Sequence, residues 1–358
     1  TKLIFGLGKT IAIDSVVAVW PDGRKSILRS VKPDQTLVIK QTEAARAAEP
    51  VNTLKYVFTK NDNDHGINFR HRENVFSDFD RDPSFFHMLS TQGPHITKGD
   101  VNKDGLEDIY FGGAKDQPGA LYIQTAAGQF KKTNEALFAL DSASEDTDAL
   151  FFDADNDGDQ DLHVCSGGNE FSPNSSALIS RLYINDGKGK FTKSPQVLPS
   201  FIFESTSCVT AADYDTDGDQ DLFVGVRVKP LSYGDPCKGY ILQNDGRGKF
   251  TDVTKTVAPS LQQVGMITDA EWFDYDNDKR PDLVIAGEFM PVKILHNDGG
   301  KLNDITVPAG LALTKGWWNR LVIADVNNDN YPDIIAGNHG LNSRFTAGPK
   351  TPVTLYAA

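Results

Sequence analysis

Residues 153–161 read D-A-D-N-D-G-D-Q-D, with aspartate at every odd position and glycine at position 6. The apolar residues 149–152 precede this acidic segment, and the strand-forming run 162–164 follows it. Related nine-residue segments lie between similar apolar runs elsewhere in the chain. An acidic loop between two short strands therefore repeats along the sequence. We number these segments loop 1 (100–108), loop 2 (153–161), loop 3 (213–221), loop 4 (274–282) and loop 5 (325–333).

A second repeated element follows each of loops 1 to 4 and its strand. Residues 182–192 read L-Y-I-N-D-G-K-G-K-F-T and residues 241–251 read I-L-Q-N-D-G-R-G-K-F-T, with weaker copies at 121–130 and 294–302. Asn-Asp-Gly between strand-forming flanks is a hairpin signal. Each repeat then supplies four short antiparallel strands in about 50–60 residues, the size of a propeller blade. The sequence predicts an all-β fold, a propeller of at least five blades over residues 65–358 whose last blade is incomplete.

The first 64 residues follow a different pattern. We expect a small β unit over residues 1–40, with strands at 13–20, 25–31 and 36–40 and a Pro-Asp-Gly-Arg turn between the first two. Residues 41–64 are rich in Ala, Glu, Asn and Asp, and we interpret them as a linker. The sequence starts with Thr1 and not with methionine, so we expect any signal peptide or lipoprotein anchor to lie outside it.

The chain of 358 residues carries 36 Lys and Arg against 49 Asp and Glu, a net charge of −13. The five loops hold 21 of these acidic residues, so the excess negative charge is confined to them. Such a chain is a poor candidate for binding a nucleic-acid backbone, which requires clustered Lys and Arg. No apolar run is long enough for a transmembrane segment.

The loops carry the ligand types that calcium prefers. Positions 1, 3 and 5 are always Asp or Asn and position 9 is always Asp, while position 7 can offer its main-chain carbonyl. The sequence therefore predicts about five calcium ions. The predicted ligands are Asp100, Asn102, Asp104, Leu106 and Asp108 in loop 1; Asp153, Asp155, Asp157, Asp159 and Asp161 in loop 2; Asp213, Asp215, Asp217, Asp219 and Asp221 in loop 3; Asp274, Asp276, Asp278, Arg280 and Asp282 in loop 4; and Asp325, Asn327, Asp329, Tyr331 and Asp333 in loop 5.

Other interpretations of the loops fit less well. An EF-hand needs a Glu at position 12, where this chain has apolar strand residues. A phosphatase-type nucleophile is disfavoured because one reaction needs one site, and zinc would want His or Cys ligands. Solvated acidic turns without a metal remain the structural alternative. Loops 4 and 5 should bind more weakly, because Lys279 and Asn330 replace the position-6 glycine.

The three cysteines lack the spacing of a zinc or redox site. We favour buried free thiols over a bridge between Cys208 and Cys237. No catalytic motif is present, and the aromatic residues Trp272, Trp317 and Trp318 fit strand packing better than stacking on a sugar.

The loops resemble the FG-GAP and VCBS repeats of integrin-α-like β-propellers, whose motif is D-x-D-x-D-G-x-x-D followed by an apolar strand. Residues 1–40, with F-G-L-G-K at 5–9 and V-A-V-W-P-D-G at 17–23, resemble the C-terminal part of an ASPIC/UnbV domain. This pairing is familiar in secreted bacterial proteins, notably Bacteroidetes surface proteins. The resemblance implies a secreted, periplasmic or cell-surface location and a calcium-stabilised propeller.

In such blades the loop after the second strand emerges on the face opposite the calcium loop. Polar residues of these loops could converge into a site for a protein or glycan ligand, or could be ordinary turn residues. Three functions stay open: an adhesion or binding module, a polysaccharide-acting enzyme with Glu170 and Glu288 as acid and base, and a spacer in a larger surface assembly. The candidate ligand-binding residues are Asn169, Glu170, Arg227, Glu288, Asn338 and His339.

Overall fold

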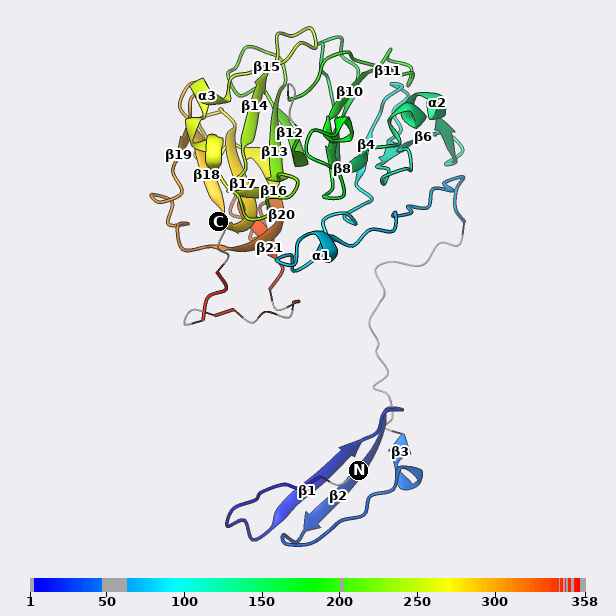
Figure 1. Ribbon diagram of the computed structural model, residues 1–358, viewed down its shortest axis with the longest axis vertical. Helices are drawn as coiled ribbons and strands as arrows, with labels where there is room; N and C mark the ends of the chain where they lie inside the picture. The colour runs from blue at the N-terminus through cyan, green and yellow to red at the C-terminus, as the bar shows by residue number, and fades with distance from the viewer. Residues whose placement is uncertain are drawn as a thin grey trace. The chain divides into compact units, whose positions relative to one another are not determined.

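Short antiparallel β-sheets follow one another along the chain in the computed structural model, which describes residues 3–46, 63–199, 203–340, 342–343, 345, 347–348 and 351–354 (Figure 1). The chain divides into two units, residues 1–62 and residues 63–358. Each of loops 1 to 5 connects the first two strands of a sheet. The all-β prediction is confirmed, and the sheets repeat as the blades of a propeller do.

The larger unit contains five consecutive sheets. Sheet 1 has β4 (Ile96–Gly99), β5 (Asp108–Phe111), β6 (Ala120–Gln124) and β7 (Phe130–Thr133); sheet 2 has β8 (Glu145–Phe152), β9 (Asp161–Gly167), β10 (Arg181–Ile184) and β11 (Thr192–Lys193). Sheet 3 has β12 (Ser205–Ala212), β13 (Asp221–Val228), β14 (Gly239–Gln243) and β15 (Thr251–Asp252). Sheet 4 has β16 (Met266–Phe273), β17 (Asp282–Met290), β18 (Lys293–Asn297) and β19 (Leu302–Asp304), and sheet 5 has β20 (Gly316–Ala324) and β21 (Asp333–Asn338). Sheets 4 and 5 join through β17 and β20, where Glu288 pairs with Trp317.

The hydrophobic core lies between successive sheets. One buried cluster joins Tyr110 of sheet 1 to Phe151 and Leu162 of sheet 2. Equivalent clusters join sheets 2 and 3 and sheets 3 and 4, and all residues of the central strand β13 are buried. A strand buried on both faces reads as a continuous apolar run, which is why residues 222–226 carry no polar alternation.

Buried aspartates connect neighbouring first strands. Asp148 of β8 accepts a hydrogen bond from the main-chain nitrogen of Val209 in β12 at 2.8 Å. Asp269 of β16 accepts one from Leu321 in β20 at 2.7 Å. The ladders of β8 and β16 each shift register beside this aspartate, so a bulge frees the carboxylate to reach the next sheet.

Helical structure is confined to single turns. No helix among the described residues is long and apolar enough to cross a membrane. These turns are η1 (Gln41–Glu43), α1 (Asp78–Arg81), α2 (Glu135–Phe138), η2 (Ala139–Asp141), η3 (Ser176–Leu178), α3 (Thr254–Val257) and η4 (Pro259–Gln263).

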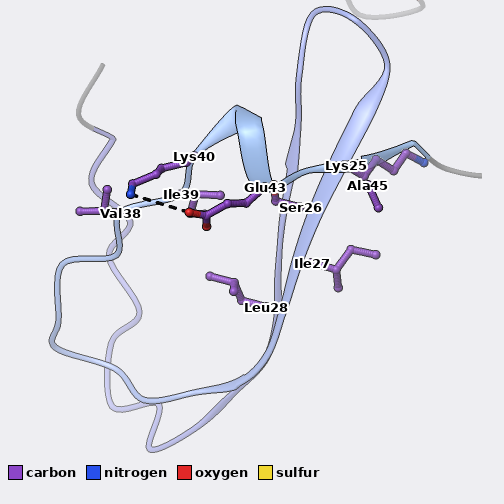
Figure 2. A pocket seen from close by; sticks show the side chains of 9 residues that line it. All are labelled: Lys25, Ser26, Ile27, Leu28, Val38, Ile39, Lys40, Glu43 and Ala45. Atoms are coloured by element: carbon purple, nitrogen blue, oxygen red, sulfur yellow. Dashed lines mark ion pairs between the residues drawn. The ribbon is translucent and has the colours of Figure 1, made fainter.

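The smaller unit is a three-stranded antiparallel sheet of β1 (Ile13–Val19), β2 (Arg24–Val31) and β3 (Ala45–Arg46). The strand predicted at 36–40 is wrong, because these residues pair with no strand, and β2 pairs instead with β3. Residues 38–40 line a cavity of about 330 Å³ together with residues 25–28 of β2, and the Lys40–Glu43 ion pair lies beside it (Figure 2). The cavity takes the place of a ladder along this part of β2.

All three cysteines are buried free thiols, as expected, and Cys208 and Cys237 form no bridge. All three tryptophans named above also pack within the protein, and Trp272 lies against the core of sheets 3 and 4. Trp317 stacks on Phe86 with ring centroids 4.0 Å apart, and Trp318 joins the core of sheets 4 and 5.

Candidate metal centre

Each acidic loop is folded by hydrogen bonds from its own main chain to its aspartates. In loop 2, the position-1 residue Asp153 accepts a bond from the nitrogen of Gly158 at 2.9 Å. The position-5 residue Asp157 accepts one from the nitrogen of Asp159 at 3.0 Å. The same two bonds recur in the other loops. The loop backbone therefore turns inward around carboxylate oxygens.

The position-9 aspartate anchors the loop to the sheet. Asp161 is fully buried, and its two oxygens accept bonds from the nitrogens of Ala154 at 2.9 Å and Asn185 at 2.7 Å. Asp108, Asp221 and Asp282 make the equivalent pairs of bonds. This residue was predicted only as a metal ligand, and the structure shows that it also fixes the end of the loop.

Two positions of every loop adopt left-handed backbone. At position 6, φ is 82° for Gly158, 70° for Lys279 and 68° for Asn330, so the chain keeps the turn even where glycine is replaced. Position 4 is also left-handed in all five loops, at Lys103, Asn156, Thr216, Asn277 and Asn328. The sequence pattern gave no sign of this second turn except in the loops where Asn, which tolerates this region, stands at position 4.

Three loops bring carboxylates together closely enough to share one ion. Oxygens of positions 1, 3 and 9 lie within 4.8 Å of one another in loop 2 (Asp153, Asp155, Asp161), loop 3 (Asp213, Asp215, Asp221) and loop 4 (Asp274, Asp276, Asp282). In loops 2 and 3 several carboxylate oxygens at positions 1, 3 and 7 are buried and have no hydrogen-bond partner among the described residues. They are Asp153 Oδ1, Asp155 Oδ1, Asp159 Oδ1, Asp215 Oδ1 and Asp219 Oδ1.

Burial and repulsion between neighbouring carboxylates destabilise the charged forms of the aspartates in loops 2 and 3. Burial, together with the nearby carboxylates, raises the pKa of Asp161 to about 7 and that of Asp221 to about 8. Burial and the adjacent Asp157 raise the pKa of Asp159 to about 6. A divalent cation would reverse this effect, because it favours the charged form of every carboxylate around it.

Position 7 differs from the prediction in loops 2 and 3. It was expected to offer only its main-chain carbonyl, but the side chains of Asp159 and Asp219 are also buried, at 4% and 8% exposure. They lie against the hairpin turns at Gly187 and Gly246, where an added Cβ would come within 3.0 Å of a carboxylate oxygen. These side chains fill the space between the loop and the turn.

The hairpin turns of repeats 2, 3 and 4 each cover the loop of the preceding repeat. Asn185 donates a side-chain hydrogen bond to the carbonyl oxygen of Val101 in loop 1 at 2.7 Å, and Asn297 donates one to Tyr214 in loop 3 at 2.7 Å. The Asn-Asp-Gly pattern predicted the turns, but not this contact between repeats.

Loops 1 and 5 have asparagine at position 3 and are arranged differently. The side-chain amide of Asn102 donates to Asp104 at 3.1 Å, and that of Asn327 donates to Asp329 at 3.0 Å. Main-chain hydrogen bonds lower the pKa of the exposed Asp325, in contrast to the raised values in loops 2 and 3. These two loops are thus satisfied to a greater extent by their own hydrogen bonds.

A histidine that the sequence analysis did not single out, His296 of β18, lies beside loop 4. His296 lies within 4.8 Å of Asp276 and Asp278, and its Nδ1 is 3.1 Å from Asp282. The Arg280 guanidinium forms an ion pair with Asp278, so loop 4 already holds one positive charge. When the hairpin segments are aligned, His296 stands at the position of Gln243, and this alignment could have drawn attention to His296.

Family comparison agrees with this repeated geometry. The model of the FG-GAP-like repeat matches residues 100–164, 153–224 and 274–336, together more than half of the chain. The chain belongs to the FG-GAP-like repeat family. The ASPIC and UnbV model matches residues 1–46. No curated protein sequence matches this FG-GAP-like chain.

Solved structures with similar folds are distant from this FG-GAP-like protein. A Bacillus licheniformis rhamnogalacturonan lyase, PL11, is 14% identical, with a TM-score of 0.39, over 69% of this chain and 44% of the lyase. A structure titled BBS1N in complex with ARL6DN is 14% identical, with a TM-score of 0.40, over 72% of this chain and 66% of the other. The FG-GAP-like chain thus spans less than half of the lyase.

The segment before sheet 1 contacts several of the predicted ligand-binding residues, at the strand ends opposite the acidic loops. Asn169, Arg227 and Glu288 are buried, with at most 8% exposure. Asn169 donates to Asp78 of α1 at 3.0 Å, and Arg227 donates to Gln92 at 2.7 Å. Of the six candidate ligand-binding residues, Asn338 is exposed and the neighbouring His339 is half-buried, with its ring near Phe86 and Trp317.

The nominated acid and base have unlike surroundings. Glu288 forms a buried ion pair with Arg227 and accepts a hydrogen bond from Tyr233 at 2.8 Å. Glu170 has no hydrogen-bond partner for its carboxylate among the described residues, and burial raises its pKa to about 7. No contact in the described part of the chain joins the two residues, and Glu288 is committed to its ion pair.

Proposed function

We propose that this protein is a calcium-stabilised extracellular or cell-surface β-propeller that acts as a protein- or glycan-binding module. The observation that carries the calcium proposal is the convergence of the carboxylates of Asp153, Asp155 and Asp161 within 4.8 Å, with unpartnered buried oxygens. FG-GAP repeats commonly bind calcium and are typical of extracellular proteins. Extracellular modules bind calcium with dissociation constants of about 10⁻⁴–10⁻³ M, and we expect these carboxylate-rich loops to bind calcium in the same range.

Calcium would stabilise the folded protein and would take no part in a reaction. Binding to the folded state alone contributes about 1.4 kcal/mol per site at ten times Kd. The ion would pair with carboxylates whose pKa values are raised by burial, and would thereby remove their repulsion. Loops 2 and 3 should bind most tightly and loops 1 and 5 less tightly, since the latter already satisfy more of their side chains.

The calcium proposal is tested by thermal melting after complete metal removal. The melting temperature should rise by many degrees on addition of calcium and fall again with chelator. Glu135→Ala, at an exposed residue outside the loops, should leave this response unchanged. An identical melting curve with and without calcium would refute the proposal.

The binding function is tested with a glycan array and a panel of extracellular proteins, each probed with calcium and with chelator. Calcium-dependent retention of one ligand class would support a binding module. The ion pair and hydrogen bonds of Glu288 disfavour the alternative of a hydrolase or lyase with a Glu170–Glu288 pair. Calcium-dependent cleavage of a polysaccharide, lost in Glu170→Gln, would instead support the enzyme. Failure of both, with a stable calcium-bound fold, would leave the role of a spacer in a surface assembly.

A further inference from the structure

Outside the five loops, one histidine and two glutamates gather at the opposite ends of the strands. His71 and Glu73 lie in the extended segment before α1, and Glu145 is the first residue of β8, whose other end leads into loop 2. One potential ligand atom from each residue lies within 4.8 Å of the others. His71 Nε2 and Glu73 Oε1 are 2.8 Å apart.

The buried member of this group has an unsatisfied oxygen. Glu145 is only 1% exposed, and its Oε2 accepts a hydrogen bond from the main-chain nitrogen of Lys115 at 2.7 Å. Its Oε1 has no partner in the described part of the chain, and neither do the buried Glu73 Oε2 and His71 Nδ1. A buried polar atom without a hydrogen-bond partner destabilises the folded protein, so three such atoms on adjacent side chains point to a ligand.

Among the described residues, no lysine or arginine pairs with Glu73 or Glu145, and His71 is the one basic side chain beside them. The Lys115 ammonium is paired with Asp116 at 2.6 Å, and the carboxylates of Glu73 and Glu170 both repel the charge of Glu145. The remaining charge is negative, and a divalent cation would balance Glu73 and Glu145 together.

The donor set identifies the class of cation. We propose that His71, Glu73 and Glu145 bind one divalent first-row transition-metal ion, of which zinc is the reference. An imidazole nitrogen with carboxylate oxygens suits this class, whereas calcium takes oxygen ligands only. His71 Nε2 and Glu73 Oε1 share a hydrogen bond of 2.8 Å, so an ion bound by both atoms would take the place of the bridging proton.

The surroundings hold the site in place and keep it accessible. The ring of His71 lies against Gly93, where an added Cβ would come within 2.5 Å of the ring, and beside Phe69. The side chains of His71 and Glu73 keep 11% and 25% of their exposure, so an ion can enter from the Glu73 side. Water would complete the coordination shell there.

The test is a calorimetric titration with zinc of the untagged chain, with all calcium sites saturated beforehand. Wild type should bind one further equivalent of zinc, and its melting temperature should rise. Glu145→Gln and Glu73→Gln should each weaken this binding at least tenfold. Glu145→Gln should also keep or raise the melting temperature of the zinc-free protein, since it removes a buried charge.

Glu135→Gln is the matched control, because Glu135 is exposed, lies outside the five loops and pairs with Lys132, and this variant should bind zinc as wild type does. Zinc binding that is unchanged in both Glu145→Gln and Glu73→Gln would overturn the proposal. So would the absence of an extra zinc equivalent in wild type, or its displacement by excess calcium at this one site.

Discussion

The side-chain amide of Asn244 lies 2.8 Å from the main-chain carbonyl oxygen of Ala154, to which it donates a hydrogen bond across 90 residues of sequence. Ala154 is position 2 of loop 2, and Asn244 opens the hairpin turn of sheet 3. The same amide reaches the carbonyl oxygen of Gln220 at 3.1 Å. One side chain thus joins its own loop 3 to the loop of the preceding repeat.

Asn244→Ala should therefore destabilise the propeller. It leaves two main-chain carbonyl oxygens without their donor, which should lower the free energy of unfolding by about 1–3 kcal/mol. Asn303→Ala, at an exposed position of β19, is the control and should change stability by less than about 0.5 kcal/mol. Chemical denaturation in saturating calcium measures both. Equal stabilities of the two variants would contradict the proposed coupling.

Asp155→Asn should separate the two roles of loop 2. Asp155 has an unpartnered buried oxygen and a pKa raised by burial and by its neighbour Asp157. The neutral amide should keep or increase the stability of the metal-free protein, because it relieves repulsion. It should also reduce the gain in melting temperature that calcium brings. A full calcium response in this variant would show that loop 2 does not bind the ion.

Lys279→Gly should stabilise the protein by about 1 kcal/mol, because Lys279 holds a left-handed conformation that glycine adopts without a steric penalty. Asn330→Gly should gain less, since asparagine tolerates this region. The reciprocal change, Gly158→Lys, should lower stability. Thermal melting compares all three, and a loss of stability in Lys279→Gly would show that the lysine makes a contact worth more than the strain.

Acid should destabilise the protein through His87. Burial and the neighbouring Arg227 lower the pKa of His87 to about 4, below its ordinary value of about 6.5. Below pH 6.5 the unfolded chain takes up a proton that the folded chain does not, so stability present above that pH is lost as the pH falls toward 4. The loss should reach about 1–2 kcal/mol at pH 5.

His87→Gln should flatten this pH dependence, because the glutamine does not titrate and can still accept the hydrogen bond from Arg227. Unfolding free energies at pH 7.5 and 5.0, in saturating calcium, give the comparison. A wild-type slope in the variant would assign the acid sensitivity to other groups.

Local patterns in the sequence were sufficient to predict the loops and the hairpins. The aspartates at odd positions and the Asn-Asp-Gly turns act within nine to eleven residues, and the structure places strands on both sides of each, as expected. The strand predicted at 36–40 failed because an apolar run does not show whether a partner strand lies beside it. The true partner of β2 is the two-residue strand Ala45–Arg46.

Contacts between distant segments could not be predicted from the sequence. Asn169 was predicted as a ligand-binding residue because it lies in the loop after a second strand, but it donates a hydrogen bond to Asp78, 91 residues earlier. The grouping of His71 with Glu145 was not predicted, because Glu145 belongs to β8 and His71 to the segment before α1, far apart in the sequence. Such pairs depend on how the sheets are placed, and no short pattern encodes that placement.

The covering of each loop by the next hairpin also imposes a direction on how the protein matures. A ribosome synthesises loop 2 before Asn244, so the contacts around loop 2 stay incomplete until the following repeat has emerged and folded. Each repeat completes its predecessor, and the order of completion runs from the N-terminus toward the C-terminus. A force that pulls on the C-terminal end would undo the same contacts in reverse order, one repeat at a time.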